Sequence, residues 1–165
     1  MACGPFTRTA GFYKNHPAIT QQIITNAGGL TVCGHPITDV DIDHGHSALE
    51  AMCVSPHGDQ RVQLIRQLTA AALNLNSGST ATFSNFASCN AVCANSGSSE
   101  SAISSCVSQT DAFNQSGDSL PAEFDDDCGD DDDFPGPPGP ADPNPCKAAG
   151  DTPCILTSTS LCAVP

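Results

Sequence analysis

The segment that runs from Asp39 to Glu50 has residue types and a spacing that could bind a metal ion. Four acidic residues occupy its relative positions 1, 3, 5 and 12, and a serine occupies position 9, which is the spacing of oxygen ligands in a calcium-binding loop. These residues are Asp39, Asp41, Asp43, Glu50 and Ser47. His44 departs from the pattern, because it stands where such loops use glycine for a sharp turn. The spacing therefore predicts a calcium site that lacks this glycine.

Two other interpretations of the same segment are open. His44 and His46 are two residues apart, so on a strand they face the same side and, with Asp43, could contribute to a zinc or copper site. No further ligand is evident to complete such a site. In the other interpretation the aspartates form a hydrated loop, and Glu50 pairs with Ser47 in a capping box that starts a helix.

Cysteine is the most unusual feature of the composition, with ten cysteines against five Lys and Arg. In an oxidising compartment these cysteines would form a framework of disulfides, and we therefore expect a secreted, extracellular protein. The cysteines are Cys3, Cys33, Cys53, Cys89, Cys93, Cys106, Cys128, Cys146, Cys154 and Cys162. Their spacing leaves the pairing open, including bonds between chains. Cys89 and Cys93 share a helix face, so we expect each to bond a separate partner.

Charge and apolar content exclude several classes of protein. The net charge of −13 argues against nucleic acid and anionic membranes as partners. The chain has no run of about 18 apolar residues, so we expect no membrane insertion. The opening residues lack the apolar segment of a signal peptide, and we expect a mature exported chain. Because G-x-S-x-G and C-x-x-C motifs are both missing, we expect no enzymatic activity.

Apolar periodicity and capping residues predict a mostly helical protein. Pro17 suits a first helical turn, and Asp59 can cap the most regular helix of the chain. The expected elements are helices over residues 17–27, 47–53, 60–75, 83–93 and 103–117 and short strands over residues 30–33 and 154–157. His35 is followed by proline, and we expect it to lie in a turn.

The chain divides into two parts of different composition. Residues 1–117 carry nearly all the helix-compatible sequence and predict a helical, disulfide-stapled domain. In residues 118–165, which we call the arm, eight of the eleven residues 123–133 are acidic and six prolines fall within residues 135–145. Like charges repel and proline lacks a backbone donor, so neither run folds alone. The expected fold class is a small, mostly α, disulfide-rich domain with an irregular acidic and proline-rich C-terminal tail.

Two segments of the helical part match known signatures. Residues 11–17 read GFYKNHP, and residues 58–74 read GDQRVQLIRQLTAAALN. They resemble the GFWKNHP signature and the QLxAAxLN helix of a domain of unknown function that recurs in secreted bacterial and archaeal proteins. The similarity covers residues 11–78, with Tyr13 where tryptophan is usual. The resemblance implies an exported extracellular module and brings no catalytic residues with it.

Three functions follow from these observations, in order of preference. The first is a secreted, non-enzymatic structural or adhesive module that self-assembles through its arm into a filament or surface layer, with copies of itself as partners. The second is an extracellular calcium- or cation-binding protein, with calcium as the candidate cofactor. The third is a metal-dependent hydrolase that uses His44 and His46.

Overall fold

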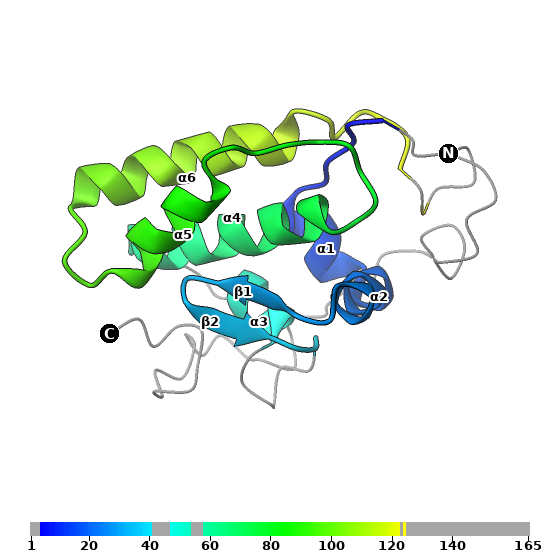
Figure 1. Ribbon diagram of the computed structural model, residues 1–165, viewed down its shortest axis with the longest axis horizontal. Helices are drawn as coiled ribbons and strands as arrows, with labels where there is room; N and C mark the ends of the chain where they lie inside the picture. Colours follow the sequence, from blue (N-terminus) through cyan, green and yellow to red (C-terminus); the bar gives the residue numbers. More distant parts are fainter. Residues whose placement is uncertain (1–3, 41–46, 54–57, 123, 125–165) are drawn as a thin grey trace.

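We describe the protein from a computed structural model, which defines residues 4–40, 47–53, 58–122 and 124. Over these residues the fold is mostly α, which confirms the expected fold class, with six helices and one antiparallel pair of strands (Figure 1). The elements are α1 (Ala10–Asn15), α2 (Pro17–Ala27), β1 (Leu30–Val32), β2 (His35–Ile37), α3 (Ala48–Cys53), α4 (Gln60–Leu75), α5 (Phe86–Ala94) and α6 (Glu100–Gln115). The expected strand over residues 154–157 lies outside the described residues.

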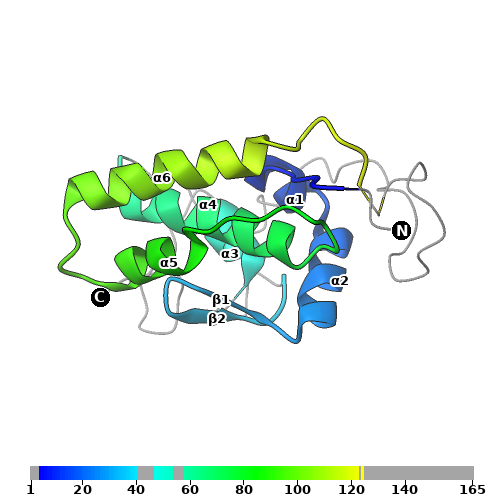
Figure 2. The same ribbon diagram turned by 45° about the horizontal axis from the view of Figure 1, so that its top comes forward.

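Helix α4 is the centre of the packing. It contacts α6 most extensively, and it also packs against α1, α3, α5 and β1. In Figures 1 and 2, α6 runs alongside α4 on one side, and the two strands lie on the other side. Asp59 caps its start as expected, because the carboxylate Oδ1 accepts a hydrogen bond from the backbone N–H of Arg61 at 2.9 Å. The helix ends at Leu75, where the sequence predicts its end.

The GFYKNHP segment forms α1 and the first residue of α2, a short helix that the sequence pattern did not predict. Thr9 caps α1 by accepting the backbone N–H of Phe12 at 3.3 Å. His16 interrupts the helix with φ of −126° and ψ of 66°, outside the helical region that the following proline disfavours, and Pro17 then begins α2. Gly28, with φ of 73°, ends α2 in the left-handed conformation.

The two strands form a tight hairpin, and the position of His35 in it corrects a prediction from the sequence. The sequence predicts His35 in a turn, whereas it begins β2 and pairs with Val32. The turn residues are Cys33 and Gly34, whose φ angles of 56° and 78° fit the two-residue hairpin turn that follows the twist of the strands. Proline at position 36 is tolerated because each strand of a two-stranded pair has one edge free of ladder hydrogen bonds.

Disulfides attach α5 to the rest of the domain. Cys93 bonds Cys33 in the hairpin turn, and Cys89 bonds Cys106 on α6, which confirms that the two α5 cysteines have separate partners. Cys53 is also disulfide-bonded, and its partner is not among the other described cysteines, because those four pair with each other. The remaining cysteines, Cys3, Cys128, Cys146, Cys154 and Cys162, lie outside the described residues.

No described helix combines the length and the apolar character that crossing a membrane requires. The two disulfides indicate an oxidising environment.

Candidate functional site

The candidate metal loop is described at its two ends. Asp39 forms a parallel β-bridge with Ser47, and the backbone N–H of Ala48 donates to the Asp39 carbonyl at 2.9 Å. The bridge brings together the start and the end of the loop, and Glu50 follows in the first turn of α3. Asp41, Asp43, His44 and His46 lie outside the described residues.

Ser47 caps α3, as the third interpretation of this segment expects. Its buried hydroxyl oxygen accepts hydrogen bonds from the backbone N–H groups of Leu49 at 3.2 Å and Glu50 at 3.4 Å. Within residues 4–40, 47–53, 58–122 and 124, no group of three His, Cys, Asp or Glu side chains could hold a metal ion. The calcium and transition-metal interpretations stay predictions, because most of their proposed ligands are not described.

A second candidate site lies where the arm leaves the domain. The guanidinium of Arg8 donates hydrogen bonds to carbonyl oxygens of Thr7 at 2.8 Å, Gly117 at 3.3 Å, Asp118 at 3.2 Å and Leu120 at 2.7 Å. Arg8 is buried, so these carbonyls supply polar partners for a charge that has left water. We call the contacts of residues 6–8 with residues 117–124 the root clamp.

Aromatic rings complete the root clamp. The guanidinium carbon of Arg8 lies 5.8–6.0 Å from the ring centroids of Phe6, Phe12 and Phe124, within cation–π range. Phe124 also meets Phe6 edge-on at 5.7 Å and stacks on Phe12 at 5.4 Å. It is 1% exposed and belongs to the hydrophobic core together with Ala122. The core thus extends past residue 117, while the division of the chain at that residue stays a prediction.

Gly117 is the point of closest approach in the root clamp. The backbone N–H of Thr7 donates to the Gly117 carbonyl at 3.1 Å, and the N–H of Gly117 donates to the Thr7 hydroxyl oxygen at 2.9 Å. A Cβ atom at position 117 would collide with the carbonyl oxygen of Pro5 and lie 2.9 Å from the Thr7 nitrogen. Glycine is therefore required here by space.

A buried polar network connects the root clamp to α4. Asn74 accepts hydrogen bonds at Oδ1 from the Arg8 backbone N–H at 2.7 Å and from the Tyr13 hydroxyl at 2.6 Å. Its Nδ2 donates to the Arg8 carbonyl at 2.9 Å and to Asn114 Oδ1 at 3.0 Å. The side chains of Arg8, Tyr13, Asn74 and Asn114 are all buried, so each of these hydrogen bonds satisfies groups that water does not reach. Burial also raises the pKa of Tyr13 far above its ordinary value.

The network joins residues 11–17 to residues 58–74, since Tyr13 belongs to the first segment and Asn74 to the second. Sequence reasoning missed Arg8, Asn74, Asn114 and Gly117. Asn74 is part of a helical repeat of mostly apolar residues, and its partners lie 40 to 66 residues away in the chain. One signal could have found Asn74: it is an asparagine on an otherwise apolar helix face, near the end of the helix.

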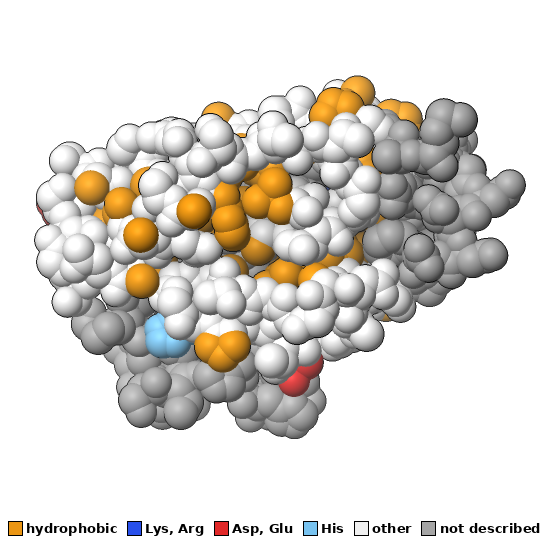
Figure 3. Space-filling view, in the orientation of Figure 1, with side chains coloured by type: hydrophobic (Ala, Val, Ile, Leu, Met, Phe, Trp, Pro, Cys, Tyr) orange, Lys and Arg blue, Asp and Glu red, His pale blue; other side chains and the backbone are white. Residues whose placement is uncertain are grey.

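An open apolar hollow of about 440 Å³ lies between β1, α4 and α5. Hydrophobic side chains show on this face of the molecule, between α5 and the hairpin (Figure 3). Two of its polar side chains already serve the fold: Asn90 binds the backbone of Thr31 and Cys33, and Asn76 donates to the carbonyl of Ala72.

Comparison with protein families, with curated proteins and with solved structures finds no match to this chain. The function has to be argued from the residues themselves.

Proposed function

We propose that the protein is a secreted, non-enzymatic structural module, in which the helical domain holds the base of the arm and the rest of the arm binds another copy. The observation that carries this proposal is the root clamp, in which Arg8 binds the carbonyls of Gly117, Asp118 and Leu120. Residues that start a composition-biased tail are thereby packed into the core of the domain.

A fixed base gives the arm a defined direction. Association costs the conformational freedom of every segment that it orders, and a segment already held at one end loses less. A contact between the arm of one copy and the domain of the next is heterologous, and it generates a filament unless the rotation closes a ring. The clamp thus suits the arm for assembly.

Secretion is part of the same proposal. The oxidising environment that the disulfides indicate is met outside the cell, and the resemblance to an exported bacterial and archaeal domain points the same way. The high negative charge favours a soluble chain that assembles through specific contacts.

Light scattering and electron microscopy of the oxidised full chain test the proposal. We expect particles larger than a monomer, which grow with protein concentration. Excess synthetic peptide of residues 125–145, with Cys128 replaced by serine, should compete and reduce their size. A chain that stays monomeric at all concentrations, or particles that the peptide leaves unchanged, would contradict assembly through the arm.

Cation binding is the second candidate function, and the Asp39–Ser47 bridge favours it. The bridge closes the base of the segment that carries the calcium-loop spacing. Titration calorimetry of the oxidised chain with calcium should give heat, and an Asp41→Asn, Asp43→Asn variant should abolish it. Equal heats for the two proteins would exclude this segment as the site.

A further inference from the structure

Two basic side chains of the domain are not used by the fold. Four of the five Lys and Arg residues are described, and two of these serve the main chain: Arg8 in the root clamp, and Arg61, which donates to the carbonyls of Cys93 and Asn95 at the end of α5. Among the residues that the structure describes, the other two, Lys14 and Arg66, form no hydrogen bond or ion pair. The chain has few basic residues, so two neighbouring ones without such contacts are candidates for binding a ligand.

Arg66 lines a cavity of about 260 Å³ between the start of α1, one face of α4 and α6. Small and polar residues line it: Thr9, Ala10, Gly11, Gln63, Arg66, Gln67 and Asp111. Its volume is below the roughly 300–1,000 Å³ of sites for drug-sized ligands, so it suits a molecule of a few heavy atoms.

The cavity has charges of opposite sign that do not neutralise each other. Arg66 and Asp111 both line it and both are half-buried, yet no ion pair joins them. The one side-chain hydrogen bond of Asp111 comes from Gln115 Nε2 at 2.9 Å, which leaves most of its acceptor capacity unused. Lys14 lies near Arg66 but does not line the cavity: burial, and then repulsion from Arg66, lower the pKa of its ammonium.

Neutral groups around the cavity have unused donors. Gln67 accepts a hydrogen bond from Asn114 at Oε1, so its amide NH₂ is left to donate. The Thr9 hydroxyl oxygen accepts from the backbone of Phe12, and its proton is left to donate. A ligand carboxylate would therefore meet the guanidinium together with neutral donors.

We propose that this cavity binds a small zwitterion, such as a free α-amino acid, with its carboxylate at Arg66 and its ammonium group at Asp111. A zwitterion has no net charge, so the net charge of −13 does not repel it, as it would an anion. Arginine suits the carboxylate because its planar fork donates two parallel hydrogen bonds. This binding is independent of the arm and adds a ligand to the proposed structural role.

NMR titration of the oxidised full chain with L-alanine tests the site. We expect saturable shifts of the amide signals of Gly11, Gln67 and Asp111. Propionate and ethylamine, which each carry one of the two charged groups, should bind at least about tenfold more weakly, since each loses one charge-assisted hydrogen-bonded contact. Shifts that are equal for alanine and propionate would overturn the zwitterion assignment.

Two variants locate the binding. Arg66→Gln and Asp111→Asn should each weaken alanine binding by about tenfold or more, while Glu100→Gln, on the same helix as Asp111, should leave it unchanged. Neither pocket variant removes a contact that the fold needs beyond the Asp111–Gln115 pair, and thermal melting checks this. No saturable shift with alanine, or unchanged binding in Arg66→Gln, would overturn the proposal. Light scattering of the same variants reports assembly separately, so failure of one proposal is distinguishable from failure of the other.

Discussion

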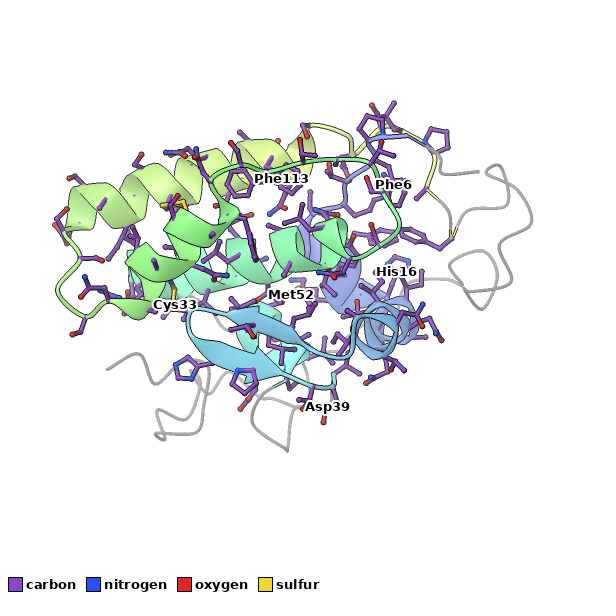
Figure 4. The ribbon with its side chains drawn as sticks, viewed as in Figure 1. Phe6, His16, Cys33, Asp39, Met52 and Phe113 are labelled. Atoms are coloured by element: carbon purple, nitrogen blue, oxygen red, sulfur yellow. A yellow bond between two sulfur atoms is a disulfide. The ribbon has the colours of Figure 1, made fainter. Side chains whose placement is uncertain are left out.

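The two ends of the domain are held by different kinds of interaction. At the end marked by Cys33 in Figure 4, two disulfides connect the hairpin turn, α5 and α6. At the opposite end, near Phe6 and His16, the root clamp and the Asn74 network hold the chain by hydrogen bonds and aromatic contacts. The arm leaves from this second end.

The difference follows from what each end can bury. The fully buried side chains of α5 are Cys89 and Cys93, and Phe86 and Val92 pack against the core only partly buried, so disulfides hold much of this helix in place. The clamp end buries Phe6, Tyr13 and Phe124, and its polar groups are matched to partners. We infer that both ends stabilise the domain, and that the non-covalent end also fixes the direction of the arm.

Loss of the Asn74 side chain should have the largest effect. Asn74→Ala removes four hydrogen bonds and leaves buried groups of Arg8, Tyr13 and Asn114 without partners, which we expect to cost about 4 kcal/mol or more. Urea denaturation measures it. Asn76→Ala, two residues further on, removes an exposed contact within the helix end and should cost under about 1 kcal/mol. Similar costs for the two variants would show that the network does not stabilise the clamp end.

Loss of the longer disulfide should come next. The Cys33–Cys93 bond closes a separation of 60 residues and the Cys89–Cys106 bond one of 17, which correspond to about 4 and about 3 kcal/mol in the chain-entropy account. Cys33→Ala, Cys93→Ala should therefore lower the urea midpoint more than Cys89→Ala, Cys106→Ala does. The reverse order would mean that contacts in the folded state, and not loop closure, decide the contribution of each bond.

A methyl group at position 117 should disturb the base of the arm specifically. Gly117→Ala forces the backbone of residues 5–7 and 117 apart, at about 2 kcal/mol, comparable to overpacking a core. Gly97→Ala, at an exposed turn where the added atom meets a side-chain oxygen at 3.3 Å, should cost under about 0.5 kcal/mol. The assembly seen by light scattering should weaken in Gly117→Ala and persist in Gly97→Ala. If both variants assemble equally, the root clamp is not needed for assembly through the arm.

The Tyr13 hydroxyl should have the smallest effect at neutral pH and a distinct one in alkali. Tyr13→Phe leaves Asn74 Oδ1 with its Arg8 donor, so we expect a loss of about 1 kcal/mol. Because burial raises the folded-state pKa of Tyr13, the unfolded state releases the proton first. The free energy of unfolding should be unaffected by this group below about pH 10 and should fall by about 1.4 kcal/mol per pH unit above it.

Tyrosinate absorbance follows this group alone, since the chain has one tyrosine and no tryptophan. We expect the absorbance to rise together with unfolding, and the alkaline loss of stability to be smaller in Tyr13→Phe. Ionisation of Tyr13 in a folded protein near pH 10 would show that the hydroxyl is accessible to water.

Local patterns in the sequence predicted five of the six described helices and missed α1 and the contacts of the clamp end. Asp59 and the apolar repeat that follows it are neighbours in the chain, so the bounds of α4 can be read directly. The separate partners of Cys89 and Cys93 follow from their shared helix face. Phe124 lies beside an acidic run, and its burial depends on Phe6 and Phe12, more than 100 residues earlier. No local rule connects such positions.

The candidate sites also differ in whether the sequence alone can indicate them. The calcium-loop spacing is visible in the sequence, and the structure adds the Asp39–Ser47 bridge at its base. The cavity beside Arg66 is assembled from α1, α4 and α6, whose residues come together through packing alone. Sequence spacing could not have indicated it.

Hydrogen exchange of the Cys89→Ala, Cys106→Ala variant tests most directly whether the base of the arm is held without the disulfide that joins α5 to α6. The backbone N–H groups of Thr7, Arg8 and Gly117 are all hydrogen-bonded in the clamp end, and those of α5 lie beside the missing disulfide. We predict that α5 loses protection while Thr7, Arg8 and Gly117 keep theirs. Loss of protection at both ends together would contradict a clamp that holds the arm independently of the Cys89–Cys106 disulfide.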